Sequence, residues 1–189
     1  MVTHVLFIHG AGQGAYAEDQ KLVTDLQQAL GAGYEMRYPA MPDEGNAPYE
    51  QWKRLIEHEL AAMHGPIILV GHSVGGSILA KCLGEIDVAK AVADIILLAT
   101  PFWGGAGWTY DGYEELALPQ DAAVTFPKGP RLLLYHCRDD ATVPFDHLAL
   151  FAQALPQAQV RQLDHGGHQL AHAMPLVAQN IQSLERSAP

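Results

Sequence analysis

The sequence predicts an α/β fold: a mainly parallel β-sheet with helices on both of its faces. Short apolar segments of strand length recur along the chain, and segments with helical spacing separate them. These strand segments are apolar at nearly every position, which is typical of strands buried on both faces. The chain of 189 residues shows no internal repeat and no Gly/Ser-rich linker. We therefore expect residues 1–189 to form a single domain.

The first half of the chain alternates regularly between the two kinds of segment. Val2–Ile8 is a short apolar run with a β-branched bias and predicts the first strand. Leucines, valine and alanine at helical spacing predict a helix over Lys21–Leu30. Tyr34–Tyr38 predicts a second strand that a proline ends. Gln51–Met63 carries its apolar residues on one helical face, and Ile67–Val70 predicts the third strand.

The second half continues this alternation to the end of the chain. A helix is expected over Ser77–Leu83, directly after the third strand. Further strands are expected at Ile95–Ala99, Arg131–His136 and Gln159–Leu163, and further helices at Phe145–Leu155 and Leu176–Leu184. In such a sheet functional groups gather beyond the carboxyl ends of the strands. The residues that follow each strand are therefore the candidates for a site.

Composition and charge exclude several classes of partner. A formal net charge of −10 argues against nucleic acid and against anionic membrane surfaces. No apolar run approaches the roughly 20 residues of a membrane span. The N-terminus lacks the basic region and cleavage site of a signal peptide, so a cytoplasmic protein is expected. Cys82 and Cys137 do not make a disulfide framework and are expected to be buried free thiols.

The third strand leads into a motif of the type G-x-S-x-G, which runs from Gly71 through Ser73 to Gly75. Small residues two before and two after the serine let neighbouring backbone come close at a strained strand-to-helix turn. Such a turn lifts the hydroxyl into a cleft and leaves the next amide at a helix N-terminus. A purely structural glycine turn is the alternative. His72 is expected to be a packing residue whose side chain points away from the serine.

Carboxylates and histidines follow at the same edge of the predicted sheet. Asp139 and Asp140 come after the fifth strand and compete for the role of acid. His165, His168 and His172 come after the sixth strand and compete for the role of base. The three histidines could also suggest zinc, but two glycines between them break any helix and no thiol accompanies them. A serine, a carboxylate and a histidine thus lie at one edge, in that chain order.

Together with the His9–Gly12 turn after the first strand, this pattern resembles the α/β-hydrolase fold. The resemblance implies that Ser73 is the nucleophile. The family's G-G-H pattern falls on His168, which becomes the base, and its D-x-x-V-P pattern falls on Asp140, which becomes the acid. The resemblance also implies an oxyanion hole made by the amides of Val74 and Ala11, with Gly12 as the alternative second donor.

Two departures from larger members of that family imply a compact form. The chain opens directly at the first strand of the core, and residues 101–130 are too few for a helical lid domain. The resemblance then implies a six-stranded core with strand order 2-1-3-4-5-6. This form resembles the small serine hydrolases related to retinoblastoma-binding protein 9 and the bacterial YdeN-like proteins.

The segment 101–115 follows the fourth strand and should border the cleft. Its aromatic residues are Phe102, Trp103, Trp108, Tyr110 and Tyr113. These rings are expected either to form an apolar wall for an acyl or leaving group or to cover the core. Phe102, Trp103 and Trp108 are the aromatic substrate-binding candidates, and Gly10 and Gly12 of the first turn complete the set.

The expected function is hydrolysis of a carboxylic ester or similar acyl bond of a small soluble substrate, through an acyl-enzyme on Ser73. No cofactor is implied, and no protein partner can be named. One alternative is a protein-interaction module that keeps the fold without turnover. The other is the same triad used as an aminopeptidase, thioesterase or lactonase.

Overall fold

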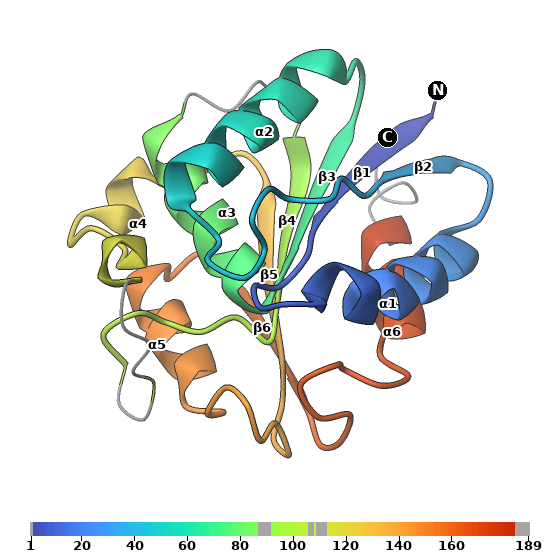
Figure 1. The fold of residues 1–189 in the computed structure, drawn as a ribbon. Coiled ribbons are helices and arrows are strands. Elements are labelled where there is room, and N and C mark those ends of the chain that lie inside the picture. Colours follow the sequence, from blue (N-terminus) through green and yellow to red (C-terminus); the bar gives the residue numbers. More distant parts are fainter. Residues whose placement is uncertain (1, 87–91, 106–107, 109–112, 184–189) are drawn as a thin grey trace.

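The computed structural model describes residues 2–86, 92–105, 108 and 113–183, and its centre is one six-stranded sheet (Figure 1). The strands are β1 (Thr3–Ile8), β2 (Tyr34–Arg37), β3 (Ile67–His72), β4 (Val92–Leu98), β5 (Arg131–Cys137) and β6 (Gln159–Leu163). Their order is β2-β1-β3-β4-β5-β6, and every neighbouring pair is parallel. The expected fold class and strand order are confirmed, with a fully parallel rather than mainly parallel sheet.

Helices cover both faces of the sheet (Figure 1). On one face lie α1 (Ala15–Leu30) and α6 (Met174–Gln182), which contact each other. On the other lie α2 (Tyr49–Ala62), α3 (Ser73–Glu85) and α5 (His147–Ala154). The short helices η1 (Glu114–Leu116) and α4 (Ala122–Thr125) stand between β4 and β5, and the sequence patterns did not predict either of them.

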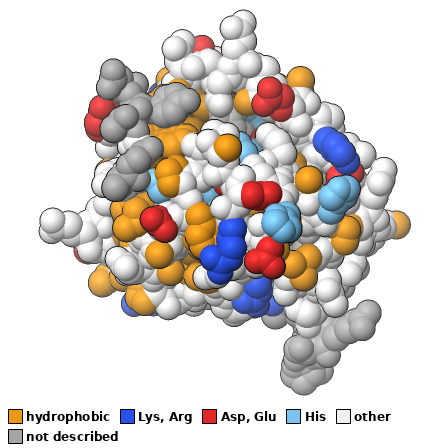
Figure 2. All heavy atoms as spheres, turned by 90° about the horizontal axis from the view of Figure 1, so that it is seen from below, with side chains coloured by type: hydrophobic (Ala, Val, Ile, Leu, Met, Phe, Trp, Pro, Cys, Tyr) orange, Lys and Arg blue, Asp and Glu red, His pale blue; other side chains and the backbone are white. Residues whose placement is uncertain are grey.

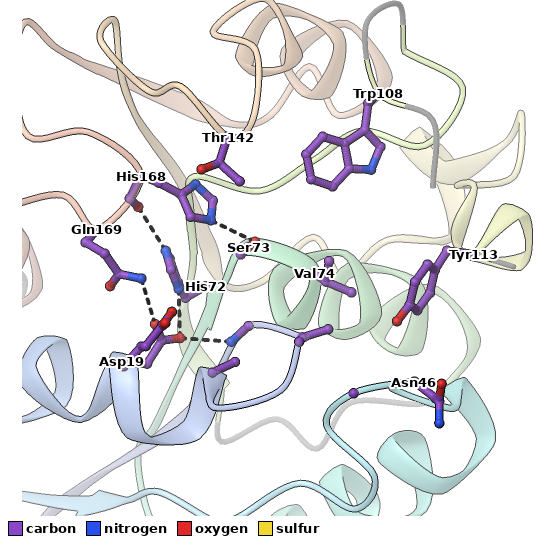
Figure 3. Close-up of a pocket in the computed structure, with 16 residues that line it drawn as sticks. Asp19, Asn46, His72, Ser73, Val74, Trp108, Tyr113, Thr142, His168 and Gln169 are labelled. Atoms are coloured by element: carbon purple, nitrogen blue, oxygen red, sulfur yellow. Dashed lines mark hydrogen bonds and ion pairs between the residues drawn. The ribbon is translucent and has the colours of Figure 1, made fainter. Parts of the chain in front are cut away.

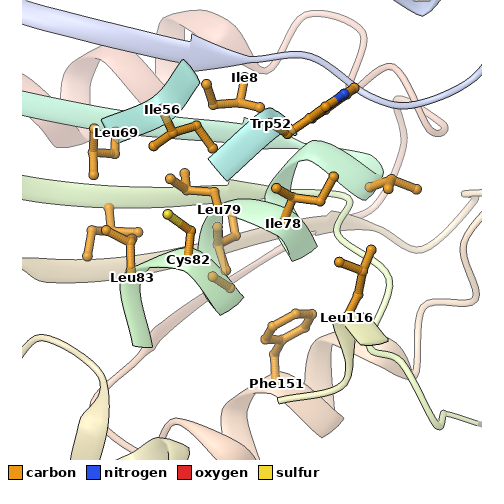
Figure 4. Packing of buried hydrophobic residues seen from close by; sticks show 14 of the residues in the cluster. Ile8, Trp52, Ile56, Leu69, Ile78, Leu79, Cys82, Leu83, Leu116 and Phe151 are labelled. Carbon is orange, nitrogen blue, oxygen red and sulfur yellow. The ribbon is translucent and has the colours of Figure 1, made fainter. Parts of the chain in front are cut away.

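The core forms two layers because successive side chains of a strand point to opposite faces. In β3, Ile67 and Leu69 join the cluster beneath α2, α3 and α5, while Ile68 and Val70 join the cluster beneath α1 and α6. Figure 4 shows the first cluster, in which Trp52 packs with residues of β1, β3 and α3. Burial on both faces explains the continuous apolar runs.

Register brings the ends of the central strands level. Ile8 of β1 pairs with Gly71 of β3, and Gly71 pairs with Leu97 of β4. At the other side of the sheet, Cys137 of β5 pairs with Leu163 of β6. The loops after β1, β3, β5 and β6 therefore meet at one edge, as the crossover topology requires.

Two helices begin at least four residues earlier than their apolar periodicity indicated. α1 starts at Ala15 instead of Lys21, and its first turns carry the polar residues Glu18 and Asp19, which break the apolar pattern. α3 starts at Ser73 instead of Ser77, through a glycine-rich stretch that helix propensity disfavours. In α3, tertiary packing therefore outweighs helix propensity.

No helix among the described residues is long and apolar enough to span a bilayer. Cys82 and Cys137 are both buried and free, as expected from their positions in a helix and a strand.

Candidate active site

The turn between β3 and α3 holds Ser73 in a strained conformation. Ser73 has φ +51°, in the left-handed region that non-glycine residues seldom adopt. The neighbouring backbone is very close: a Cβ added to Gly75 would lie 2.0 Å from the His9 carbonyl oxygen, and one added to Gly71 would lie 2.6 Å from the Cα of Gly76. The glycines on both sides of the serine therefore have the steric reason that the motif predicted.

Ser73, His168 and Asp140 form one hydrogen-bonded series (Figure 3 shows its first link). The Oγ of Ser73 lies 3.0 Å from Nε2 of His168, and Nδ1 of His168 lies 2.9 Å from Oδ2 of Asp140. Ser73 is 7% exposed, and the Asp140 side chain is fully buried. The three residues follow β3, β5 and β6, whose carboxyl ends lie at the same edge of the sheet.

The Asp140 carboxylate is held from several directions. Its Oδ1 accepts hydrogen bonds from the amides of Thr142 and Val143, at 2.8 and 2.9 Å. Its Oδ2 lies 3.1 Å from Nε2 of His136, which also donates to the Val143 carbonyl. Burial raises the pKa of Asp140, but hydrogen bonds from His136 and His168 outweigh it and hold this pKa well below its usual range. The carboxylate is therefore ionised and fixed in orientation.

Asp139, the competing carboxylate, lies elsewhere. Its side chain is 44% exposed and accepts hydrogen bonds from the amides of Gly167 at 2.8 Å and Gly166 at 3.2 Å. The Gly167 bond in particular lowers the pKa of Asp139. Asp139 is thus an exposed turn residue, and it also anchors the loop that carries His168, because that loop's glycine amides point at its carboxylate.

The other two histidines of this loop lie apart from the series. His165 is exposed and sits 3.7 Å from Asp139, and His172 is exposed in a left-handed conformation. Within the described part of the chain, no three His, Cys, Asp or Glu side chains converge into a metal site.

His72 lies inside the site, and the expectation that it packs away from the serine is wrong. Its ring is buried, lines the cleft and stands 4.9 Å from the His168 ring, centroid to centroid. Nδ1 lies 2.7 Å from Oδ2 of Asp19, and Nε2 lies 3.0 Å from the His168 carbonyl oxygen. Asp19, a residue that the motif search did not single out, therefore belongs to the same network.

Hydrogen bonds to the His9 ring, to Asp19 and to Glu44 fix the turn after β1. The His9 ring donates from Nδ1 to the Gly10 carbonyl at 2.7 Å and accepts the Met41 amide at Nε2, at 3.0 Å. Burial lowers the pKa of His9, which suits this neutral form. The Gly10 amide donates to Asp19, and the Gly12 amide donates to the Glu44 carbonyl at 2.8 Å.

These loops enclose a cleft of about 580 Å³ beside Ser73 (Figure 3). Its lining includes the predicted residues Gly10, Ala11, Gly12, Ser73, Val74, Trp108 and His168. Tyr113 and Asn46 form another part of the wall, and Thr142 and Gln169 flank the histidine. The view from below Figure 1 looks at this edge of the sheet, where charged side chains of both signs and histidines alternate with apolar areas (Figure 2).

Two aromatic candidates pack with the core rather than line the cleft. Trp103 is 7% exposed and packs edge-on against Trp108, at 5.8 Å between ring centroids. Phe102 packs against Phe151 of α5, at 5.2 Å. Neither lines the cleft that the described residues form. Both rings thus serve the core, while Trp108 reaches the cleft; Tyr110 lies outside the described residues.

Asp19, which the motif search did not single out, has one signal in the sequence that depends on knowing where α1 begins. The buried stripe of α1 runs from Ala15 through Asp19 to Leu22 and Leu26. A carboxylate on an apolar helical stripe indicates a buried partner. Because the helix was expected to begin after this residue, the signal was not available.

Known proteins resemble this chain in sequence and in structure. Residues 19–174 match the family model described as serine hydrolase. The structure of the ydeN gene product from B. subtilis shares 19% identity over 97% of this chain and 98% of that one, with a TM-score of 0.66. The esterase domain of a Rhodothermus marinus protein shares 20% identity over 97% and 86%, with a TM-score of 0.71.

A meta-cleavage product hydrolase from Pseudomonas fluorescens IP01 has a TM-score of 0.72 at 15% identity, over 97% of this chain and 92% of that one. No curated protein sequence matches significantly. At these identities the solved structures bear on the fold alone. The family match spans most of the chain, from Asp19 to Met174. This chain belongs to the serine hydrolase family and has the α/β-hydrolase fold.

Proposed function

We propose that this serine hydrolase cleaves a carboxylic ester, or a similar acyl bond, of a small substrate through an acyl-enzyme on Ser73. One observation carries the proposal: the unbroken series from Ser73 Oγ through His168 to Asp140, with links of 3.0 and 2.9 Å. An unassisted serine hydroxyl is a weak nucleophile, and an adjacent base activates it.

In the proposed reaction His168 takes the proton of Ser73 while Oγ attacks the acyl carbon. The proton then passes from Nε2 to the leaving oxygen, which departs as an alcohol. Water repeats the sequence on the acyl-enzyme and releases the acid. Asp140 accepts the Nδ1–H of His168, fixes that tautomer and stabilises the imidazolium that forms.

The proposed oxyanion hole consists of the amides of Val74 and Ala11. Val74 stands in the first turn of α3, where backbone amides have no acceptor within the helix. The planar peptide joins the Gly10 carbonyl to the Ala11 amide, and the two point in opposite directions. Because His9 holds that carbonyl, the Ala11 amide is aimed away from His9. The Gly12 amide is already bound to Glu44, which favours Ala11 over Gly12.

The cleft walls support a small, partly polar substrate. Trp108, Tyr113 and Val74 offer apolar area, while Asn46, Thr142 and Gln169 offer hydrogen-bonding groups. A mixed lining of this kind suits a short acyl group with a polar neighbour more than a long alkyl chain.

A fluorophosphonate probe tests the proposed mechanism. It should label the native protein and fail to label Ser73→Ala. Ser77→Ala is a matched control, since Ser77 is a buried serine of the same helix that donates to the Pro101 carbonyl at 2.7 Å. Labelling of Ser73→Ala at the native rate, or no labelling of a folded native protein, would contradict the proposal. Esters, thioesters and aminoacyl amides then identify the bond.

A further inference from the structure

The network that joins Asp19 and His72 has no role in the mechanism above, yet it lies against it (Figure 3). Both ring nitrogens of His72 face acceptors: a carboxylate oxygen at 2.7 Å and a carbonyl oxygen at 3.0 Å. Neither acceptor carries a hydrogen, so each nitrogen must supply one. His72 is therefore an imidazolium, paired with the Asp19 carboxylate. The two side chains are only 1% and 2% exposed.

This pair connects two loops that lie on opposite sides of Ser73. Asp19 Oδ2 also accepts the Gly10 amide at 2.8 Å, and Gly10 immediately precedes Ala11. A Cβ on Gly10 would lie 3.7 Å from both Asp19 Oδ2 and His72 Nδ1, so this loop rests directly on the pair. On the other side, His72 holds the backbone carbonyl of His168, and Gln169 donates to Asp19 Oδ1 at 3.3 Å.

We propose that Asp19 and His72 are positioning residues. They form a buried ion pair that sets the distance between the oxyanion loop (His9–Gly12), which carries the proposed donor Ala11, and the proposed base His168. The inference rests on the function proposed above. The oxyanion loop is pinned at the Gly10 amide by Asp19, and the base is pinned at its own carbonyl by His72. Since β3, α1 and the loops after β1 and β6 all contribute to this network, a shift in any of them would alter the alignment.

The surroundings of His72 favour its charged state. Burial lowers the pKa of His72, but the Asp19 carboxylate, the His168 carbonyl and the more distant Asp140 outweigh it, so that this pKa is raised. The other titratable rings that face it are those of His9 and His168. The pKa of Asp19, raised by burial, is lowered on balance by His72 and by the Gly10 amide.

The first test compares two equally buried carboxylates. Asp94 is 1% exposed like Asp19 and pairs with Arg131 at 2.8 Å, but it lies near the amino end of β4, away from the cleft. Asp19→Ala should lower kcat on p-nitrophenyl acetate about 100-fold with KM changed less than about threefold, since small misplacements cost that much. Asp94→Ala should lower Tm about as much as Asp19→Ala does, but it should leave kcat within about twofold of the native value.

The conservative variant separates positioning from charge. Asp19 Oδ2 accepts both the Gly10 amide and the Nδ1–H of His72, and the amide oxygen of Asn at position 19 can accept both from a neutral His72, so Asp19→Asn should return kcat to within about fivefold of native. If Asp19→Ala does not fold, His72→Gln takes its place, and its kcat should fall about tenfold because it loses the link to Asp19. An Asp19→Ala or His72→Gln enzyme with native kcat, or an Asp19→Asn enzyme as slow as Asp19→Ala, would overturn the proposal.

An NMR measurement tests the pair independently of activity. The ¹⁵N shifts of His72 at neutral pH should report two protonated nitrogens in the native protein and one in Asp19→Asn. A neutral His72 in the native protein would overturn the ion pair even if turnover is normal. Conversely, a native protein that the probe does not label would contradict the proposed function while leaving the NMR result intact.

Discussion

At the scale of single residues, two adjacent carboxylates have different surroundings. Asp140 is buried and bonded to His168, whereas Asp139 is partly exposed and bonded to the amides of Gly166 and Gly167. A proposed member of the mechanism and a loop anchor are therefore consecutive residues in the sequence.

Exchanging each carboxylate for its amide tests this assignment. Asp140→Asn should lower kcat by about 10³- to 10⁴-fold, because the amide favours the wrong tautomer of His168. Asp139→Asn keeps an acceptor for the glycine amides and should change kcat by less than about fivefold. Steady-state rates on p-nitrophenyl acetate at constant pH measure both. If the two effects are exchanged, the acid has been assigned to the wrong residue.

The Asp19–His72 pair also predicts a dependence of stability on pH. A raised pKa in the folded state makes His72 contribute stability below its unfolded pKa of about 6.5, and this is lost as pH rises through the folded value. In Asp19→Asn the buried ring should have a lowered pKa, so that its contribution has the opposite sign. The stability difference between native protein and Asp19→Asn should therefore be larger at pH 5.5 than at pH 8.

Urea unfolding at these two pH values measures the difference directly. The other histidines and carboxylates are common to both proteins, so their titration cancels in the comparison. A difference that is equal at both pH values, or larger at pH 8, would mean that His72 is neutral in the native protein.

At the scale of elements, the junction of β3 and α3 does most to place Ser73, the proposed nucleophile. Its glycines are required by contact with neighbouring backbone rather than by the turn alone: Gly75 faces the His9 and Ile8 carbonyls of β1 and the turn after it. The same contact also brings the turn after β1, with the proposed oxyanion donor Ala11, beside Ser73.

A single added methyl group tests this contact. Gly75→Ala would place a Cβ 2.0 Å from the His9 carbonyl oxygen, so it should destabilise the fold by about 3 kcal/mol or more. Gly33→Ala is a matched control, since a Cβ there meets nothing within 4 Å, and it should change stability by less than about 1 kcal/mol. Urea unfolding measures both. Equal stability of the two variants would show that the junction is looser than its contacts indicate.

At the scale of the whole molecule, one sheet edge gathers groups from strands that are distant in sequence. Between β4 and β5, the described residues form only η1 and α4, and neither amounts to a helical lid. Among the described residues, Trp108 and Tyr113 are the large aromatic side chains on the cleft wall. The lining that these residues form is only partly apolar.

This architecture predicts a preference for short acyl chains. Each CH₂ gains about 0.8 kcal/mol only while apolar surface covers it. Rates on p-nitrophenyl esters should peak at about two to six carbons and fall for longer chains. Trp108→Ala should shift this profile more than it changes the rate on the acetyl ester. A maximum at long chains, or a jump in rate where the substrate forms droplets, would sink this prediction.

Local patterns determined much of this protein in advance. Apolar periodicity and glycine placement predicted the sheet and its longer helices. They also predicted that a serine, carboxylates and histidines follow the strands at the carboxyl edge, because both signals depend on neighbours a few positions apart. The choice of Asp140 and His168 among their neighbours needed family resemblance as well. Element ends were less well predicted where polar or glycine-rich turns begin a helix, as at Ala15 and Ser73.

Tertiary structure alone decided which side chains share an environment. His72 meets Asp19 across 53 positions, and Gln169 meets Asp19 across 150, so no local pattern encodes either contact. The same holds for the aromatic segment, where packing against α5 takes Phe102 into the core while Trp108 reaches the cleft. The physical reason is that a polar side chain is buried at low cost only where it has a hydrogen-bonding partner, and the fold brings that partner from a distant part of the sequence.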